Sequence, residues 1–292
     1  MTTDDSNAQQ AAHWNDQAGP RWVRLQRQLD AQLAPLGEFA LDAVGLAAGD
    51  RVLDVGCGCG ASSRAAAARV APGGRTVGID LSGPMLERAR ELAEAEGSEQ
   101  LEFVQADAQT HAFERLEPRG FDAILSRFGV MFFASPEAAF ENLRSALVPG
   151  GRLAFVCWQR LADNTWMSAP LAAVARHLDD LPPPPAPGAP GPFAFADPGR
   201  VRGILAAAGF EQARVEALEG AMLLGGAQTA REAADFVVEM GPAGTVLRES
   251  GADAALRERV AVDAAKALEP FVREGGVAVP YAAWLVSARS PA

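Results

Sequence analysis

Short apolar runs alternate with amphipathic stretches along most of this chain. The apolar runs are rich in β-branched and aliphatic residues, as buried strands are, and lie at residues 52–55, 75–80, 101–105, 121–126, 152–158, 210–218 and 277–288. Patterns with helical spacing lie between them, at residues 62–70, 84–96, 136–147 and 198–209. Strands and helices that alternate in this way predict an α/β fold with a doubly wound, mostly parallel sheet.

The first apolar run ends in a glycine-rich loop. Gly56, Gly58 and Gly60 occupy alternate positions directly after the strand, so the backbone can turn sharply there and let a ligand lie against it. A dinucleotide-binding loop has the spacing G-x-G-x-x-G, and here Ala61 stands where its third glycine would fall. The spacing therefore argues against a nicotinamide oxidoreductase. Two alternatives stay open at this point: a nicotinamide oxidoreductase with an unusual loop, and some other doubly wound protein.

Two carboxylates flank the loop. Asp54 precedes Gly56 by two residues, where a carboxylate would repel a pyrophosphate but suits an ammonium group. Asp80 ends the second apolar run, where an acid can accept hydrogen bonds from both hydroxyls of a ribose. A ribose without a phosphate and an amino acid ammonium together describe S-adenosylmethionine.

Three motifs in this order resemble a known family. DVGCGCG at residues 54–60, GID ending at Asp80 and QADA around Asp107 resemble the class I S-adenosylmethionine-dependent methyltransferases. The chain is most similar to the small-molecule branch that includes the ubiquinone and menaquinone biosynthesis methyltransferases, above all over residues 49–158. The resemblance implies a seven-stranded Rossmann-like sheet and S-adenosyl-L-methionine as the cofactor.

The resemblance also implies roles for individual residues. Asp107 corresponds to the acid that meets the adenine amino group, although it could instead cap a turn, and Met85 corresponds to the apolar wall of the adenine. The full set of expected cofactor-binding residues is Asp54, Gly56, Cys57, Gly58, Gly60, Asp80, Leu81, Met85, Asp107, Ala108, Ser126 and Trp22.

Aromatic residues cluster in two stretches that this fold would bring to the same edge of the sheet. A helical pattern at residues 11–33, interrupted at Gly19-Pro20 and followed by a further helix at 36–44, carries two tryptophans. They either attach this segment to the core or form a lid over the cofactor, as N-terminal helices of the family do. The loop after the fourth strand is rich in aromatic residues and methionine. These side chains either form a pocket for an apolar acceptor or pack against the next helix. The expected acceptor-contacting residues are Trp14, Phe128, Met131, Phe132 and Trp158.

Methyl transfer from a sulfonium needs alignment and exclusion of water more than it needs a protein acid or base. The candidates for a catalytic role are His111, Arg127 and His13. His111 could instead cap the turn at Thr110, and Arg127 could either orient an anionic acceptor or pair with a carboxylate. Metal is not expected, because Cys57 and Cys59 alone cannot complete a tetrahedral site.

The expected division of the chain follows from these elements. We predict an N-terminal helical lid at 1–45, a cofactor-binding core at 46–160, an insertion with a Pro-rich linker at 161–196, a return to the core at 197–220, a helical insertion at 221–276 and a last core strand at 277–292. The two insertions should form a small helical cap that sets the choice of substrate.

Composition narrows the function further. The chain has 292 residues and a net charge of −11, which argues against nucleic acid as a partner. It has three cysteines, no apolar run long enough to span a membrane and an acidic, polar start, so we expect a cytoplasmic protein. Lys266 is the only lysine beside many arginines and alanines, a composition typical of a bacterial coding sequence. We expect metal-free methyl transfer to a small apolar or aromatic molecule, and consider a homodimer for its assembly. The alternative is a methyltransferase-fold enzyme that uses the bound cofactor for cyclisation or decarboxylation.

Overall fold

The structure is a computed structural model that describes residues 3–116, 120–178 and 180–292. The chain starts with consecutive helices: α1 (Thr3–Ala12), a π-helix (His13–Ala18), α2 (Gly19–Arg24) and α3 (Gln26–Val44). The predicted break at Gly19-Pro20 and the separate helix at 36–44 are both wrong. Ala18 and Gly19 both keep right-handed helical dihedral angles, so the π-helix passes directly into α2 with Pro20 in its first turn. The helical backbone is interrupted at Leu25 instead.

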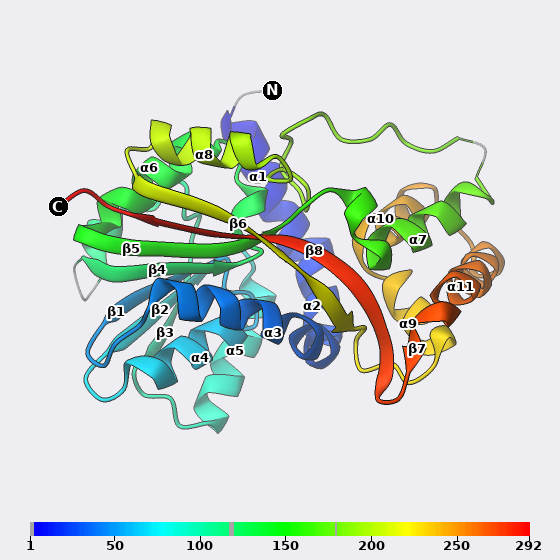
Figure 1. Cartoon of the computed structure of the whole chain (residues 1–292), viewed down its shortest axis with the longest axis horizontal. Coiled ribbons are helices and arrows are strands. Elements are labelled where there is room, and N and C mark those ends of the chain that lie inside the picture. Colours follow the sequence, from blue (N-terminus) through cyan, green and yellow to red (C-terminus); the bar gives the residue numbers. More distant parts are fainter. Residues whose placement is uncertain (1–2, 117–119, 179) are drawn as a thin grey trace.

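One sheet forms the centre of the molecule, with strand order β3-β2-β1-β4-β5-β8-β6 (Figure 1). Its strands are β1 (Arg51–Val55), β2 (Arg75–Asp80), β3 (Leu101–Gln105), β4 (Phe121–Arg127), β5 (Leu147–Trp158), β6 (Glu211–Leu223) and β8 (Gly276–Arg289). The first five are parallel, whereas β8 runs antiparallel to both β5 and β6. A two-residue strand, β7 (Val272–Arg273), pairs with β8. The predicted doubly wound, mostly parallel Rossmann-like sheet is confirmed.

Helices cover both faces of the sheet. Ala154 of β5 packs toward α3 and α4 (Ala61–Val70), with Val52 and Ala123 of the neighbouring strands. The next residue, Phe155, packs on the opposite face against Phe140 of α6 (Pro136–Ala146), near α8 (Pro198–Ala207). Helix α5 (Gly83–Ala95) packs against β3. The alternation of side chains along β5 therefore explains why one strand serves two cores.

The remaining helices gather at one end of the sheet (Figure 1). Helices α7 (Thr165–Ala175), α9 (Ala230–Val237), α10 (Gly241–Glu249) and α11 (Ala254–Leu268) pack on one another, and we call them the cap. Short 3₁₀ helices lie at Phe113–Arg115, Val130–Phe132, Leu161–Asp163 and Glu269–Phe271. Strands β6 and β8 pair over a long stretch and extend from the sheet toward the cap. No helix in the described part of the chain is long and apolar enough to cross a membrane.

Candidate functional site

The loop after β1 lies close to the loop after β4, at the carboxyl edge of the parallel strands. Gly56 has a φ of +67°, and a Cβ added to it would lie 2.6 Å from the Gly129 Cα. Only glycine permits both the conformation and the approach. Gly58 has a φ of +56°, and a Cβ there would lie 2.7 Å from the Met85 Cε. Gly56 therefore holds bare backbone against the backbone of Gly129, and Gly58 holds it against the flexible end of the Met85 side chain.

Asp80 stands beside that backbone at the end of β2. Its Oδ2 accepts a hydrogen bond of 2.8 Å from the Gly58 N–H, and its Oδ1 accepts one of 2.9 Å from the Ser82 N–H. Burial raises the pKa of the Asp80 carboxyl above its ordinary value, while the two backbone donors oppose that shift. Each oxygen keeps lone-pair capacity for a further donor such as a ribose hydroxyl.

Asp54 is completely buried beneath the glycine loop. Its Oδ2 accepts hydrogen bonds from the hydroxyls of Ser62 (2.7 Å) and Ser63 (2.5 Å) at the start of α4. Its Oδ1 has no hydrogen-bond partner in the described chain, although it is buried. Burial raises the pKa of Asp54 to about 6, and the serine hydroxyls oppose the shift. A buried carboxylate oxygen without a donor fits a ligand that brings an ammonium group.

The expected adenine side follows β2 and β3. Met85 is buried in the first turns of α5, whose N-cap is Ser82, and Leu81 lies between Asp80 and that cap. Asp107 accepts a hydrogen bond of 2.9 Å from the Gln109 N–H through its Oδ1, so it does shape the turn, and Ala108 beside it is buried. These residues fit an adenosyl group, because the apolar side chain of Met85 and the carboxylates of Asp80 and Asp107 lie along the same carboxyl edge of the sheet.

The N-terminal segment is attached to this edge by hydrogen bonds. The Asn15 side-chain amide donates to the Leu81 carbonyl (3.0 Å) and accepts from the Gly83 N–H (2.9 Å). The Ser82 hydroxyl donates to the Trp14 carbonyl at 2.9 Å. Sequence reasoning missed Asn15, since nothing in a lone asparagine indicates a partner 66 residues away. The segment therefore lies over the loop that follows Asp80.

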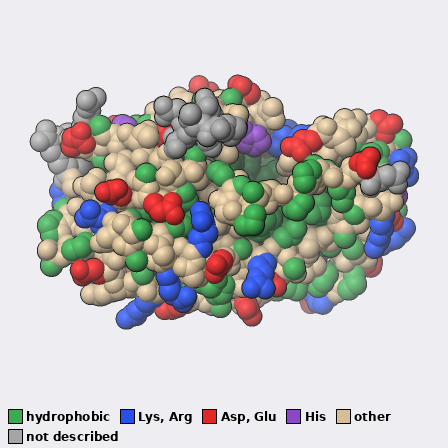
Figure 2. Space-filling model, turned by 90° about the horizontal axis from the view of Figure 1, so that it is seen from above, with side chains coloured by type: hydrophobic (Ala, Val, Ile, Leu, Met, Phe, Trp, Pro, Cys, Tyr) green, Lys and Arg blue, Asp and Glu red, His purple; other side chains and the backbone are tan. Residues whose placement is uncertain are grey.

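Aromatic rings pack on one another next to this attachment. The Trp14 ring meets Phe132 edge-on at 5.1 Å between centroids and Trp22 at 6.1 Å. Phe128, in a left-handed conformation with φ of +60°, stacks on Trp158 at 4.1 Å. Met131 is buried, and its sulfur accepts the Trp158 N–H at 3.4 Å. Figure 2 shows hydrophobic side chains around a hollow in the upper face of the molecule.

The three catalytic candidates do not converge on one point. Arg127 forms an ion pair of 3.1 Å with Asp30 of α3 and is largely buried, so of the two alternatives the structure shows the carboxylate pairing. The Nε2 of His111 is buried without a hydrogen-bond partner in the described chain, and its ring packs on Phe113. The His13 ring lies edge-on to Trp14, and burial followed by the charges of Arg21 and Arg248 lowers its pKa.

The cysteines and Ser126 are engaged within the fold. The side chain of Cys57 points into the cluster formed by Leu86, Ala89 and Phe103, so only its backbone borders the glycine loop. Burial raises the pKa of the Cys59 thiol to about 12, so it stays protonated and unreactive at neutral pH. The Ser126 hydroxyl donates to the Val55 carbonyl at 2.7 Å and accepts from the Gly129 N–H, which fixes the loop after β4.

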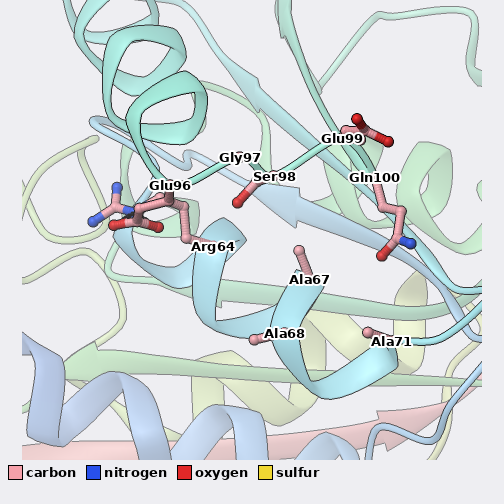
Figure 3. A pocket seen from close by; sticks show the side chains of 9 residues that line it. All are labelled: Arg64, Ala67, Ala68, Ala71, Glu96, Gly97, Ser98, Glu99 and Gln100. Carbon is pink, nitrogen blue, oxygen red and sulfur yellow. Dashed lines mark hydrogen bonds and ion pairs between the residues drawn. The ribbon is translucent and has the colours of Figure 1, made fainter.

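A separate surface depression of about 380 Å³ lies away from this site. Figure 3 shows it between the end of α4 and the turn before β3, lined by Ala67, Ala68, Ala71 and residues 96–100, with the Arg64–Glu96 ion pair at its wall. It opens at the amino ends of the strands, whereas Asp54 and Asp80 lie toward the carboxyl ends. We therefore assign it no part in the candidate site.

The glycine loop and its two carboxylates lie in a stretch that matches a known domain family. Residues 52–151 match the methyltransferase domain family, so the chain carries a domain of that family, and the resemblance found in the sequence is confirmed. The matched residues include the glycine loop, Asp80 and Asp107.

Curated relatives extend the likeness. Over 152 residues the chain is 32% identical to an aklanonic acid methyltransferase from a Streptomyces species, covering 52% of this chain and 66% of the relative. Over 104 residues it is 43% identical to a demethylmenaquinone methyltransferase from Thermus thermophilus, covering 35% of this chain and 44% of the relative. The chain thus spans less than two thirds of the length of each.

A solved structure shares the fold. The crystal structure of a putative methyltransferase from Bacillus halodurans matches with a TM-score of 0.56 and 19% identity, covering 89% of this chain and all of the other. At this identity the match supports the fold alone.

Proposed function

We propose that this protein transfers a methyl group from S-adenosylmethionine to a small acceptor with an apolar or aromatic body. The observation that carries the proposal is the meeting of three features at one edge: the bare backbone of Gly58, the carboxylates of buried Asp54 and half-buried Asp80, and the aromatic group around Trp14 and Phe132. When bound, S-adenosylmethionine would supply a methyl group on a sulfonium sulfur, and S-adenosylhomocysteine would be the leaving group.

The residues of this chain bind, orient and exclude water in this proposal. Asp80 accepts the ribose hydroxyls and the Oδ1 of Asp54 accepts the ammonium group, which together fix the cofactor at both ends. The N-terminal segment, attached through Asn15, acts as a lid, and Trp14 and Phe132 wall the acceptor. Holding two reactants in line can contribute about 7–11 kcal/mol to a displacement. A general base is optional and depends on the acceptor, because a phenol or amine must also release a proton to a base or to water.

The names of the relatives support a small organic acceptor. One is named for aklanonic acid and the other for demethylmenaquinone. The aromatic lining around Trp14 and Phe132 suits ring-containing acceptors of this general kind, since aromatic rings pack well edge-on and offset. We extend to this chain the small, ring-containing character of the acceptor and leave its identity to experiment.

Incubation with methyl-labelled S-adenosylmethionine and a panel of phenols, quinols, aromatic carboxylic acids and amines tests the proposal. We expect label in one acceptor and one S-adenosylhomocysteine for each product. Conversion of an acceptor without S-adenosylhomocysteine would support the alternative, cyclisation or decarboxylation with the cofactor retained. A Phe132→Ala variant should lose turnover more than cofactor affinity, and an Arg202→Gln variant on the exposed face of α8 serves as the matched control.

A further inference from the structure

A second concave region lies between α2 and the cap. The groove has a volume of about 530 Å³, which is within the range of small-molecule sites. Five arginines from four elements line it: Arg21 and Arg24 from α2, Arg231 from α9, Arg248 from α10 and Arg257 from α11. Such a concentration of positive charge stands out in a chain whose net charge is −11.

The acidic residues of the groove are already paired. Glu239 forms an ion pair with Arg24, which bridges the groove from the cap to α2. Asp235 and Glu258 both pair with Arg231, at 2.9 Å and 2.7 Å. These three carboxylates therefore form ion pairs only with Arg24 and Arg231.

The other three arginines have no carboxylate partner within the described ranges. Arg248 donates to the Glu239 carbonyl (3.0 Å) and to the Thr245 hydroxyl (3.1 Å). Arg257 donates only to the carbonyls of Ala252 and Leu247, each at 3.2 Å. The Arg21 side chain makes no hydrogen bond or ion pair with any described residue, although its backbone carbonyl accepts from the Leu25 N–H. Three guanidinium groups thus share one groove with donors to spare.

Burial and the mutual repulsion of the arginines lower the pKa values of two of them. Burial, followed by the charges of Arg21 and Arg257, lowers the pKa of Arg248 to about 10. Burial and the charges of Arg24 and Arg257 likewise lower the pKa of Arg21. Both side chains stay protonated at neutral pH, so the groove holds like charges that an anion would relieve.

We propose that this groove is a binding site for an oxyanion, the carboxylate or phosphate group of a small ligand, held by Arg21, Arg248 and Arg257. Guanidinium groups bind both kinds of oxyanion through paired N–H donors. Because Arg21 belongs to α2 and the other two belong to the cap, a bound oxyanion would join the N-terminal segment to the cap. The site does not depend on methyl transfer.

His13 connects the groove to the aromatic group. Its ring contacts Trp14 at 5.8 Å between centroids, and the charges of Arg21 and Arg248 act on it. An oxyanion in the groove would therefore lie near the segment that we propose as the lid.

Calorimetric titration of the full chain in Tris chloride buffer tests the site with two probes, inorganic phosphate and benzoate. We expect at least one to bind, and Arg21→Gln to weaken that binding by about tenfold or more, since a charge-assisted contact is lost. Arg21→Lys should lose less, because it keeps the charge without the paired donors. Arg202→Gln, on the exposed face of α8, is the matched control and should bind like the wild type.

The two probes separate the sources of the anion. Binding of phosphate alone assigns a phosphate ligand, and binding of benzoate alone assigns a carboxylate ligand. Because Arg21 has no partner to lose, Arg21→Gln should fold normally, which circular dichroism can check. Absence of binding by both probes, or equal binding by wild type and Arg21→Gln, would overturn the proposal whatever the methyl-transfer assay shows.

Discussion

The buried carboxylate of Asp54 should make cofactor binding depend on pH. Its pKa is about 6 in the unliganded protein, whereas an ammonium group at its Oδ1 needs the ionised form. The α-amino group of a ligand, with an ordinary pKa of about 7.7–8.0, stays charged throughout the titration of Asp54. Binding must therefore expel a proton below about pH 6 but not above it.

The magnitude follows from the fraction of Asp54 that is ionised. For a pKa of about 6, this fraction falls about tenfold from pH 7 to pH 5, so the affinity for S-adenosylmethionine should also fall about tenfold. Isothermal titration calorimetry over this range measures it. The Asp54→Asn variant should bind S-adenosylmethionine weakly at both pH values and should not show this tenfold fall in affinity. Any pH dependence of the affinity that remains in the variant is assigned to Asp80. Parallel pH profiles for wild type and variant would refute the reasoning.

The free energy of unfolding should depend on pH in the opposite sense to the affinity for the cofactor. The folded protein holds the Asp54 proton more tightly than the unfolded chain, so stability falls as pH rises from about 4 to about 6. A shift of about 2 pKa units corresponds to about 3 kcal/mol at most. Asp54→Asn should therefore unfold at no lower urea concentration than wild type at pH 8, and its relative advantage should shrink as pH falls. A large loss of stability at pH 8 would contradict this.

Two further substitutions test the packing of the site. Gly56→Ala should destabilise the protein by more than Gly73→Ala, since both have positive φ but only the first Cβ meets backbone, at Gly129; equal urea midpoints would contradict this. Gly19→Ala should release the N-terminal segment, because its Cβ would lie 2.3 Å from the Ser82 Oγ, and should speed proteolysis there; cleavage at the wild-type rate would argue against a tightly attached segment.

The local features of the site were predictable because their signals are local. A strand, a tight turn and a helix in direct succession specify the glycine loop, and the end of β2 specifies the place of Asp80. Ser62 and Ser63, which hold Asp54, were also within reach, since they open the helix directly behind the loop.

The remaining features depend on contacts between distant segments. Arg127 meets Asp30 across 97 residues, and either of its two roles was compatible with the sequence. The helical backbone at Gly19-Pro20 was missed because proline and glycine usually interrupt helices, whereas here the π-helix passes directly into α2 at these residues. The arginine groove was not predictable, because Arg21 and Arg257 come together only when α2 faces the cap.

Calorimetric titration of S-adenosylmethionine into wild type and Asp80→Ala tests the central claim most directly. We predict one site per chain in the wild type and an affinity loss of about tenfold or more in the variant, since each charge-assisted hydrogen bond contributes about 1.5–3 kcal/mol. Circular dichroism must show that the variant folds, because Asp80 also accepts from Gly58 and Ser82. No binding to the wild type, or undiminished binding to a folded Asp80→Ala protein, would contradict the account.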